Sequence, residues 1–341
     1  MTGASAGRSA SSRGRPTMND VAREAGVSLK TVSRAVNGVP TLDPALAERV
    51  FAAIRTLGYR RNELAATLRS TASTATIGLI IGDMRNSFYS SVAAGTYEIA
   101  REHGTHLITA SAEEQVELEQ ELALALCQRR VDGLLIFPAV GDQSYLQPEM
   151  DLGTSVVFLD RPGTGVSADS VRLDNVAAAH TLASMVLEEG HRRVGLLLDT
   201  LEVLTIRERL DGVRAAFEEA GMTLDDRLIS TTAHDPEAAT KATVAMLDLD
   251  DPPTAFIGKN NRAIIGIVDA LVTRGARARV VGFDDFEMSR FLPRPVTLAS
   301  FDVVELGRRG ATRLFDRIAG SAGEPTTERL PFTIVQRGSY R

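Results

Sequence analysis

The chain has 341 residues, of which 44% are hydrophobic and 24% charged, an ordinary composition for a globular protein with room for two or three domains. It contains no run of about 18 apolar residues that would predict a membrane-spanning helix. Its polar N-terminus lacks the apolar segment of a secretory signal. The single cysteine, Cys127, excludes an internal disulfide framework and a multi-thiolate metal site. We therefore expect a cytoplasmic protein in which Cys127 is a buried core residue.

Charge is unevenly divided along the chain. Residues 1–70 carry 11 Lys+Arg and 5 Asp+Glu, a net charge of +6, so the remainder carries 27 and 39, a net charge of −12. A basic head on an acidic body indicates that only the head contacts a polyanion, although chance unevenness is the alternative. Residues 1–15 are expected to be a disordered basic tail that adds non-specific attraction to phosphate.

Residues 16–60 contain the signals for three short helices. Thr17, with Asp20 three residues later, predicts the start of the first helix, and Ser28 after Gly26 predicts the start of the second. Asp43 followed by a proline predicts the third. Helices this short are marginal alone and must pack on one another. The pattern favours a helix-turn-helix, whose second helix enters the major groove of DNA, over a solvated helical hairpin without a ligand.

The stretch "TMNDVAREAGVSLKTVSRAVNG", followed by "RVFAAIRTLGYRRNELAATLRS", closely resembles the DNA-binding headpiece of the lactose-repressor (LacI/GalR) family of bacterial transcription regulators. The resemblance extends, less densely, over nearly the whole chain after residue 15. It implies that Leu29 and Lys30 read base edges, with Ser33 and Arg34 also at the DNA. The full set of DNA-binding positions that it implies is Thr17, Ser28, Leu29, Lys30, Thr31, Ser33, Arg34, Asn37, Tyr59, Asn62, Ala65 and Leu68.

Residues 61–75 are interpreted as a hinge helix and linker. By resemblance, Asn62 begins a helix that folds only on operator DNA, and Leu68 wedges between base pairs in the minor groove. From the residues alone, a small amphipathic linker that packs on its neighbour remains an alternative. Arg61 stands where the family usually has proline, which frees the backbone and offers an arginine to a phosphate.

From residue 76 to residue 341, short apolar runs alternate with helical stretches, which predicts parallel sheets with helical crossovers. The resemblance implies a periplasmic-binding-protein-like α/β body of two Rossmann-like subdomains that also mediates dimerisation. We expect the N-subdomain at about 76–171 and 302–320, and the C-subdomain at about 174–297 and 325–341. The three crossings are placed near Val171–Asp174, Thr297–Asp302 and Gly320–Pro325. A ligand is expected in the crevice at the carboxyl ends of the strands.

The effector-binding residues that the resemblance implies lie on loops after predicted strands or on a helix. They are Phe88, Tyr89, Asp160, Arg209, Asn260 and Asp284. An aromatic side chain suits the C–H face of a sugar, although one residue of the Phe88–Tyr89 pair serving only as core is equally open. The guanidinium of Arg209 suits vicinal hydroxyls or a carboxylate. Arg207, two residues earlier, is an alternative of the same type.

Two residues near Asn260 depart from the family's pattern. Asn261 stands where the family usually has aspartate, and Lys259 replaces a usual small residue. An amide can donate as well as accept, but it cannot supply a carboxylate's charge. The added lysine and the lost carboxylate together make the predicted site more positive. These departures favour a phosphorylated or carboxylated ligand over a plain neutral sugar.

No phosphate loop, HExxH motif, nucleophile elbow or metal-ligand spacing is present in the sequence, so we expect neither an enzyme nor a cofactor. The interpretation is a sequence-specific DNA-binding regulator, a repressor, controlled by a sugar or sugar derivative. It is expected to be a cytoplasmic homodimer, nucleoid-associated when bound, and no tetramer is indicated. The alternatives are an effector-independent regulator, a solute-binding protein built on the same body, and an enzyme that uses the crevice.

Overall fold

A computed structural model of the chain describes residues 16–36, 39, 41–59, 74–320 and 323–338. The chain divides into two compact units, Met1–Thr74 and Ala75–Arg341. We call the first the headpiece and the second the body. The predicted N-terminal tail, residues 1–15, and residues 61–73 of the predicted hinge and linker, 61–75, lie outside the described residues. None of the described helices is long and apolar enough to cross a membrane.

The described part of the headpiece consists of three helices, α1 (Met18–Ala25), α2 (Leu29–Val36) and α3 (Pro44–Leu57). The predicted capping box is present, because Thr17 accepts from the Asp20 backbone while the Asp20 side chain accepts from the Thr17 backbone. Gly26 ends α1 in the left-handed conformation, with φ of 62°. One small core, in which Val32 and Val50 are fully buried, joins the three helices. The predicted three-helix head is confirmed.

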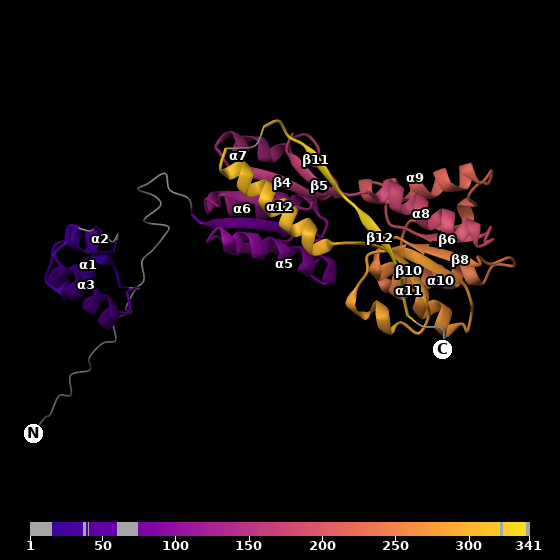
Figure 1. Ribbon diagram of the computed structural model, residues 1–341, viewed down its shortest axis with the longest axis horizontal. Coiled ribbons are helices and arrows are strands. Elements are labelled where there is room, and N and C mark those ends of the chain that lie inside the picture. Colours follow the sequence, from indigo (N-terminus) through magenta and orange to yellow (C-terminus); the bar gives the residue numbers. More distant parts are fainter. Residues whose placement is uncertain (1–15, 37–38, 40, 60–73, 321–322, 339–341) are drawn as a thin grey trace, which may run out of the picture. The chain divides into compact units, whose positions relative to one another are not determined.

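The body contains two six-stranded sheets, each flanked by helices (Figure 1). The sheet of the first lobe has the order β11-β5-β4-β3-β1-β2, and all of its paired strands are parallel. The elements of this lobe are β1 (Thr76–Ile81), α5 (Ser87–Glu102), β2 (His106–Ser111), α6 (Val116–Gln128), β3 (Gly133–Ile136), η1 (Ser144–Leu146), α7 (Gln147–Asp151), β4 (Ser155–Asp160), β5 (Asp169–Leu173), α12 (Val303–Ile318) and β11 (Thr327–Leu330).

The sheet of the second lobe has the order β12-β10-β9-β8-β6-β7, and only the β10–β12 pair is antiparallel. Its elements are α8 (Asn175–Glu188), β6 (Val194–Leu197), α9 (Leu204–Glu219), η2 (Asp226–Leu228), β7 (Ile229–Ser230), α10 (Pro236–Leu247), β8 (Ala255–Gly258), α11 (Asn261–Thr273), β9 (Arg279–Phe283), η3 (Glu287–Phe291), β10 (Val296–Phe301) and β12 (Phe332–Arg337). With the helical head, these two lobes confirm the predicted fold class.

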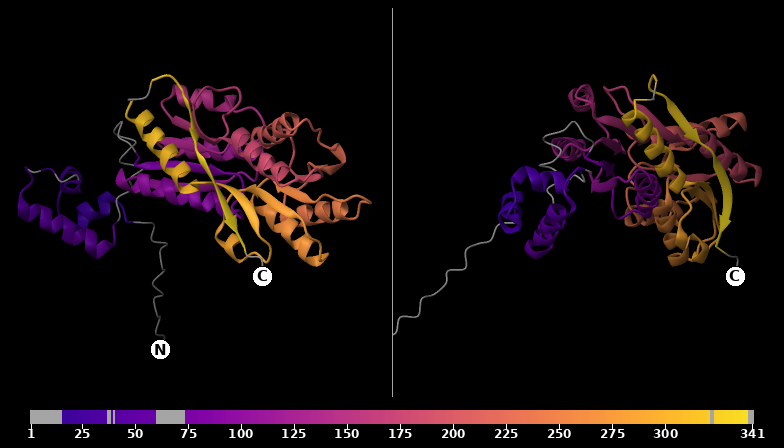
Figure 2. Two further views of the ribbon diagram at one scale, coloured as in Figure 1. Left: turned by 45° about the vertical axis from the view of Figure 1, so that its right-hand side comes forward. Right: turned by 60° about the vertical axis from the view of Figure 1, so that its left-hand side comes forward.

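The chain changes lobe after β5, after β10 and after β11. The third change falls at Pro331, between β11 and β12, so its predicted position at Gly320–Pro325 is wrong. The strand Thr327–Leu330 still belongs to the first lobe, because it pairs in parallel with β5. The yellow ribbon of β11 and β12 can be followed from one sheet to the other (Figure 2). The predicted C-subdomain segment 325–341 therefore begins several residues too early.

Helices α5 and α12 cover one face of the first sheet and approach each other closely. A Cβ atom placed on Gly95 of α5 would lie 2.0 Å from the carbonyl oxygen of Val304, and one placed on Gly307 of α12 would lie 2.1 Å from that of Val92. Glycine is required at both positions because backbone, not a mobile side chain, occupies the space. This contact ties α12, which follows the second crossing, to the first lobe.

Candidate functional site

Helix α2 exposes two of the residues that the sequence assigns to DNA and buries two that it does not. Val32 and Ala35 lie in the core of the headpiece, whereas Leu29 is 45% exposed and Lys30 is exposed. Exposure of the apolar Leu29 side chain to water does not stabilise the headpiece. Leu29 and Lys30 lie at the N-terminal end of α2, and a recognition helix presents the residues at this end to base edges. Helix α2 can therefore offer one hydrophobic and one charged group to a groove.

The neighbouring polar residues are held by short-range hydrogen bonds. The Ser28 hydroxyl accepts from the Thr31 backbone at 3.1 Å, which caps α2. The guanidinium of Arg34 donates to the Thr41 hydroxyl at 2.8 Å. Ser33 is half-buried on the same helix. These contacts fix α2 and direct Arg34 towards the start of α3 in the free protein.

The remaining predicted DNA positions fall at the edges of the headpiece. Thr17 is exposed, and its hydroxyl donates to the Asp20 carboxylate at 2.7 Å. Tyr59 is half-buried against the headpiece core. The other predicted positions, Asn37, Asn62, Ala65 and Leu68, lie outside the described residues, as does Arg61.

In the body, both sheets present charged side chains at the carboxyl ends of their strands. Asp160 ends β4 in the first lobe, while Lys259 follows β8 and Asp284 follows β9 in the second lobe. Arg209 comes from α9 of the second lobe. The positive charge of Arg209 opposes the rise in the pKa of both Asp160 and Asp284, and the charge of Asp160 raises the pKa of Asp284 further. The fold thus brings three of the predicted effector residues from distant parts of the chain into one charged cluster at the carboxyl ends of the strands, which we call the crevice.

The side chain of Arg209 is buried and held on three sides. Its Nε donates to the Asn175 side-chain oxygen at 2.9 Å, and its Nη1 donates to the backbone carbonyl of Lys259. The guanidinium carbon lies 4.1 Å from the centroid of the Phe283 ring, a cation–π contact. Arg209 is therefore positioned before any ligand arrives, which lowers the entropy lost on binding.

Asp160 and Asp284 are carboxylates in strained backbone positions, of which Asp284 is buried and Asp160 half-buried. Both have positive φ values, 69° and 66°, in the left-handed region that non-glycine residues rarely adopt. Burial raises the pKa of Asp160, although the neighbouring Arg161 and Arg209 oppose this rise. Burial raises the pKa of Asp284 to about 6, and Arg209 again opposes the effect. Asp284 Oδ1 is buried and has no hydrogen-bond partner among the described residues, so it is free to accept from a ligand hydroxyl.

Lys259 does not add a free positive charge to the crevice. Its ammonium forms an ion pair with Asp199, which follows β6, and its side chain is only 6% exposed. Burial lowers the pKa of the Lys259 ammonium, and the Asp199 carboxylate opposes this fall. The argument for an acidic ligand that rested on this lysine is therefore removed, because its charge is neutralised within the protein.

The predicted aromatic residues, Phe88 and Tyr89, lie in the first turn of α5. The rings of Phe88, Tyr89 and Phe137 meet edge to face, with centroids 4.9 to 5.9 Å apart. Of the two predicted residues, Tyr89 is the buried one, and its hydroxyl donates to Glu114 at 3.0 Å. Phe88 is only partly buried. Of the two alternatives left open by the sequence, Tyr89 is the core residue.

Several residues of the crevice were missed by sequence reasoning. Glu114 accepts from Tyr89 and also from Arg161, which is the residue directly after Asp160. Adjacency to Asp160 was a usable signal for Arg161. Glu114 precedes a helix in an unremarkable acidic stretch and gave no signal. Asn260 was predicted, yet its side-chain oxygen caps α11 by accepting from the backbone of Ala263.

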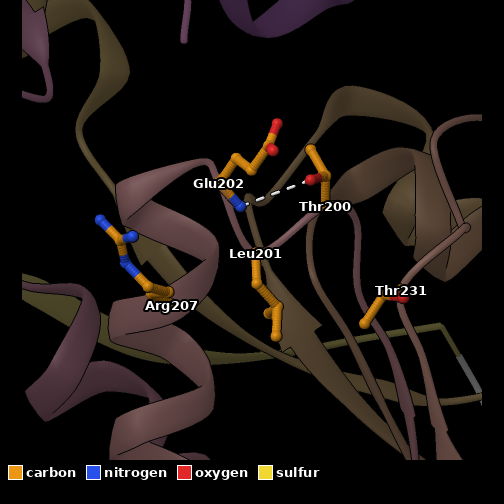
Figure 3. A pocket seen from close by; sticks show the side chains of 5 residues that line it. All are labelled: Thr200, Leu201, Glu202, Arg207 and Thr231. Carbon is orange, nitrogen blue, oxygen red and sulfur yellow. Dashed lines mark hydrogen bonds between the residues drawn. The ribbon is translucent and has the colours of Figure 1, made fainter. Parts of the chain in front are cut away.

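Arg207, the alternative to Arg209, lies on a different face of α9. It is exposed, and it lines an open pocket of about 560 Å³ on the second lobe together with Thr200, Leu201, Glu202 and Thr231 (Figure 3). The two arginines are two residues apart on a helix, so they point in different directions. Burial and fixed partners therefore favour Arg209 as the crevice residue. Among the described residues, no group of three His, Cys, Asp or Glu could hold a metal ion.

A chain that presents one helix to DNA and holds a charged crevice in a separate two-lobed body combines the parts of a ligand-controlled transcription regulator. Residues 74–336 match the model for periplasmic binding proteins and the sugar binding domain of the LacI family, and residues 17–62 match the model for bacterial regulatory proteins of the lacI family. The chain belongs to the LacI family and is a DNA-binding transcription regulator.

Individual relatives match nearly the whole length of the chain. The transcriptional regulator CelR of Thermobifida fusca is 30% identical, with 96% of this chain and 99% of the relative covered. A structure of a CelR–cellobiose complex superposes with a TM-score of 0.69 at 27% identity, covering 94% of this chain and 98% of the other. The lac repressor dimer bound to operator and the anti-inducer ONPF gives a TM-score of 0.80 at 25% identity, with the same coverage.

Proposed function

We propose that this regulator is a repressor whose affinity for operator DNA is controlled by a polyhydroxylated small molecule bound in the crevice of the body. The observation that carries the proposal is that the crevice contains both the fixed guanidinium of Arg209 and a carboxylate oxygen of Asp284 that has no hydrogen-bond partner among the described residues. The first group donates and the second accepts, which matches hydroxyls that do both. The bound cellobiose of the CelR complex is a ligand of this chemistry.

A neutral sugar fits the charges better than an acidic one. The ammonium of Lys259 is paired with Asp199, and the guanidinium of Arg161 is paired with Glu114, so neither cation is left without an anion. A phosphate or carboxylate would also meet the carboxylate of Asp284, whose raised pKa already reflects unfavourable burial of negative charge. The partly buried ring of Phe88 offers an apolar surface for a sugar face.

For the headpiece, we propose that Leu29 and Lys30 read base edges and that Arg34 contacts DNA after releasing Thr41. The exposure of Leu29 and Lys30 at the N-terminal end of α2 supports this assignment. Two headpieces on the two-fold axis of a homodimer would read a near-palindromic operator. The lac repressor, a structural relative, binds its operator as a dimer. The proposed place of action is the cytoplasm, on chromosomal DNA, and the proposal includes no catalytic step.

The test begins with selection of genomic DNA fragments by the full-length protein at moderate salt. We expect a short palindrome with a flexible central step to be enriched. Operator binding is then measured with cellobiose and a panel of other neutral and phosphorylated sugars. Release of DNA identifies an inducer, and tighter binding identifies a corepressor. Binding that no ligand of the panel changes would favour the effector-independent alternative.

A matched pair of variants tests the role of the crevice. Arg209→Lys keeps the charge but loses the planar fork that holds two hydroxyls, so we expect operator binding to persist while the response to the effector is lost. Arg207→Lys makes the same change two residues away on the exposed face of α9 and should respond as the unmodified protein does. An unaltered response of Arg209→Lys would contradict the proposed site.

A further inference from the structure

Two polar contacts join the lobes where α11 begins. The Nη1 atom of Arg262, on α11 of the second lobe, lies 2.6 Å from Oδ2 of Asp83, which follows β1 of the first lobe. The Nδ2 atom of Asn261 donates to Oδ1 of Asn86 in the same first-lobe loop at 3.0 Å. We call these four residues the interlobe clasp. The two contacts join segments about 175 residues apart in the sequence.

Stability of α11 itself does not explain these two residues. The N-terminus of a helix carries a partial positive charge, so an acidic residue there is stabilising and an arginine is unfavourable. Asn260 already caps the helix through the backbone of Ala263. Arg262 therefore occupies the first turn at some local cost, and both Asn261 and Arg262 contact the opposite lobe through their side chains. An arginine that is unfavourable for its own helix but pairs with Asp83 of the other lobe indicates a role in joining the lobes.

The clasp needs an amide at Asn261. Asn86 Oδ1 caps α5 by accepting from the backbone N–H of Phe88 at 3.1 Å, so Asn86 turns its oxygen towards Asn261. Asn261 must therefore donate, and its own oxygen accepts from the Arg262 backbone at 2.8 Å. A carboxylate at this position could still accept from the Arg262 backbone, but it would place an oxygen against the Asn86 oxygen, so that two acceptors face each other. The amide nitrogen of Asn261 is thus what permits the contact.

The ion pair of the clasp is partly shielded from solvent. The side chains of Arg262 and Asp83 are 19% and 21% exposed, so salt screens them less than a surface pair. Asp83 has a second partner within its own lobe, because Arg85 Nε donates to Oδ1 at 2.9 Å. Each carboxylate oxygen thus has a separate arginine, and only Arg262 crosses to the other lobe.

We propose that the clasp holds the ligand-free body with its lobes closed, so that an effector enters only after the Arg262–Asp83 and Asn261–Asn86 contacts have broken. The backbone N–H of Asn261 also bonds the carboxylate of Asp284. One residue of the clasp thus also contacts a proposed effector residue within the second lobe. The clasp is a property of the free protein, so its failure would leave the proposed effector chemistry untouched.

The test measures lobe separation in the full-length protein without ligand. Spin labels are placed at Glu117 and Glu237, which are exposed residues at the starts of α6 and α10, one in each lobe, in a Cys127→Ser background. Both helices start at the carboxyl ends of strands, so the label-to-label distance reports crevice opening. We expect one short distance for the unmodified clasp. Arg262→Gln should raise the ratio of open to closed molecules about tenfold, as expected for loss of a charged hydrogen bond.

Two further variants separate the clasp from a general loss of structure. Arg262→Lys retains the charge and should stay mostly closed. Arg85→Gln removes the other arginine partner of Asp83, which does not cross between lobes, and should leave the distance unchanged. Circular dichroism verifies that each variant is folded. An open distribution for the unmodified protein, or identical distributions for it and Arg262→Gln, would overturn the proposal.

Discussion

Asp284→Asn is expected to stabilise the body while it removes a proposed effector contact. The carboxylate is 7% exposed, and one of its oxygens has no partner among the described residues. Its burial opposes ionisation, so the folded protein holds an unfavourable charge at neutral pH. Asparagine removes this charge. It also tolerates the left-handed backbone, with φ of 66°, that this position requires.

The magnitude follows from the pKa. A rise from 3.8 to about 6, at about 1.4 kcal/mol per pKa unit, corresponds to about 3 kcal/mol of lost folding free energy at neutral pH. The folded Asp284 pKa lies above the unfolded value, so the folded state binds more protons between the two pKa values. Stability therefore falls as pH rises through this window. The new amide must also be buried, which leaves an expected gain of about 1–2 kcal/mol.

The assay is urea unfolding of the full-length protein from about pH 4 to about pH 8. Unfolding is monitored by tertiary signals of the body, because the headpiece and the body are separate compact units. The gain from Asp284→Asn should be largest near neutral pH and should shrink towards the acidic end. Asp285→Asn is the matched control on the next residue. Burial tends to raise the pKa of Asp285, but hydrogen bonds from Arg337 and Ser289 lower it overall.

Asp284→Asn and Asp285→Asn should therefore change the free energy of unfolding in opposite directions. The folded Asp285 pKa lies below the unfolded value, so its contribution to stability is present above the unfolded pKa and is lost on acidification. Arg337 pairs with Asp285 at 2.6 Å, and Asp285→Asn should destabilise the body most at neutral pH. Destabilisation by Asp284→Asn of equal size at every pH would refute the claim that the Asp284 carboxylate is held in an unfavourable state.

Three further predictions concern the headpiece and the first lobe. Lys30→Ala should weaken binding to the selected operator by about 1–3 kcal/mol and leave unrelated duplex nearly unaffected, measured by fluorescence anisotropy; an equal loss on both would identify a phosphate contact. Thr17→Ala should speed amide exchange in α1 about fivefold through loss of a cap of about 1 kcal/mol, whereas Thr17→Ser should not. Gly95→Ala should lower the free energy of unfolding by about 2–4 kcal/mol, because its Cβ would lie 2.0 Å from the Val304 carbonyl oxygen; an unchanged value in urea titration would contradict the close α5–α12 contact.

Effector chemistry could be only partly anticipated. Asp160, Arg209 and Asp284 were found because the family's motifs surround them, and the structure places them in one crevice. The charge of Lys259 was misjudged, because its partner Asp199 lies 60 residues away. The sequence shows that a lysine is positively charged, but it does not show which groups surround its ammonium. Whether it attracts a ligand or neutralises a neighbour depends on contacts that no local pattern records.

The sequence by itself determined the headpiece and the alternation of strands and helices in the body. Thr17, Gly26 and Ser28 act within one helical turn of their own positions, so their effects are visible in neighbouring residues. Strands such as β1 are buried along nearly their whole length and are visible as apolar runs. These features depend on hydrogen bonds and burial that are local in sequence.

Only the tertiary structure decided where the chain crosses for the third time and how the lobes meet. Strand β11 buries one of its four residues, Leu330, so it lacks the apolar run that marks the central strands. The partners of Asn261 and Arg262 lie in the loop after β1, and sheet order with lobe closure brings them together. Such pairs have no short-range signal because their distance is set by the packing of two whole lobes.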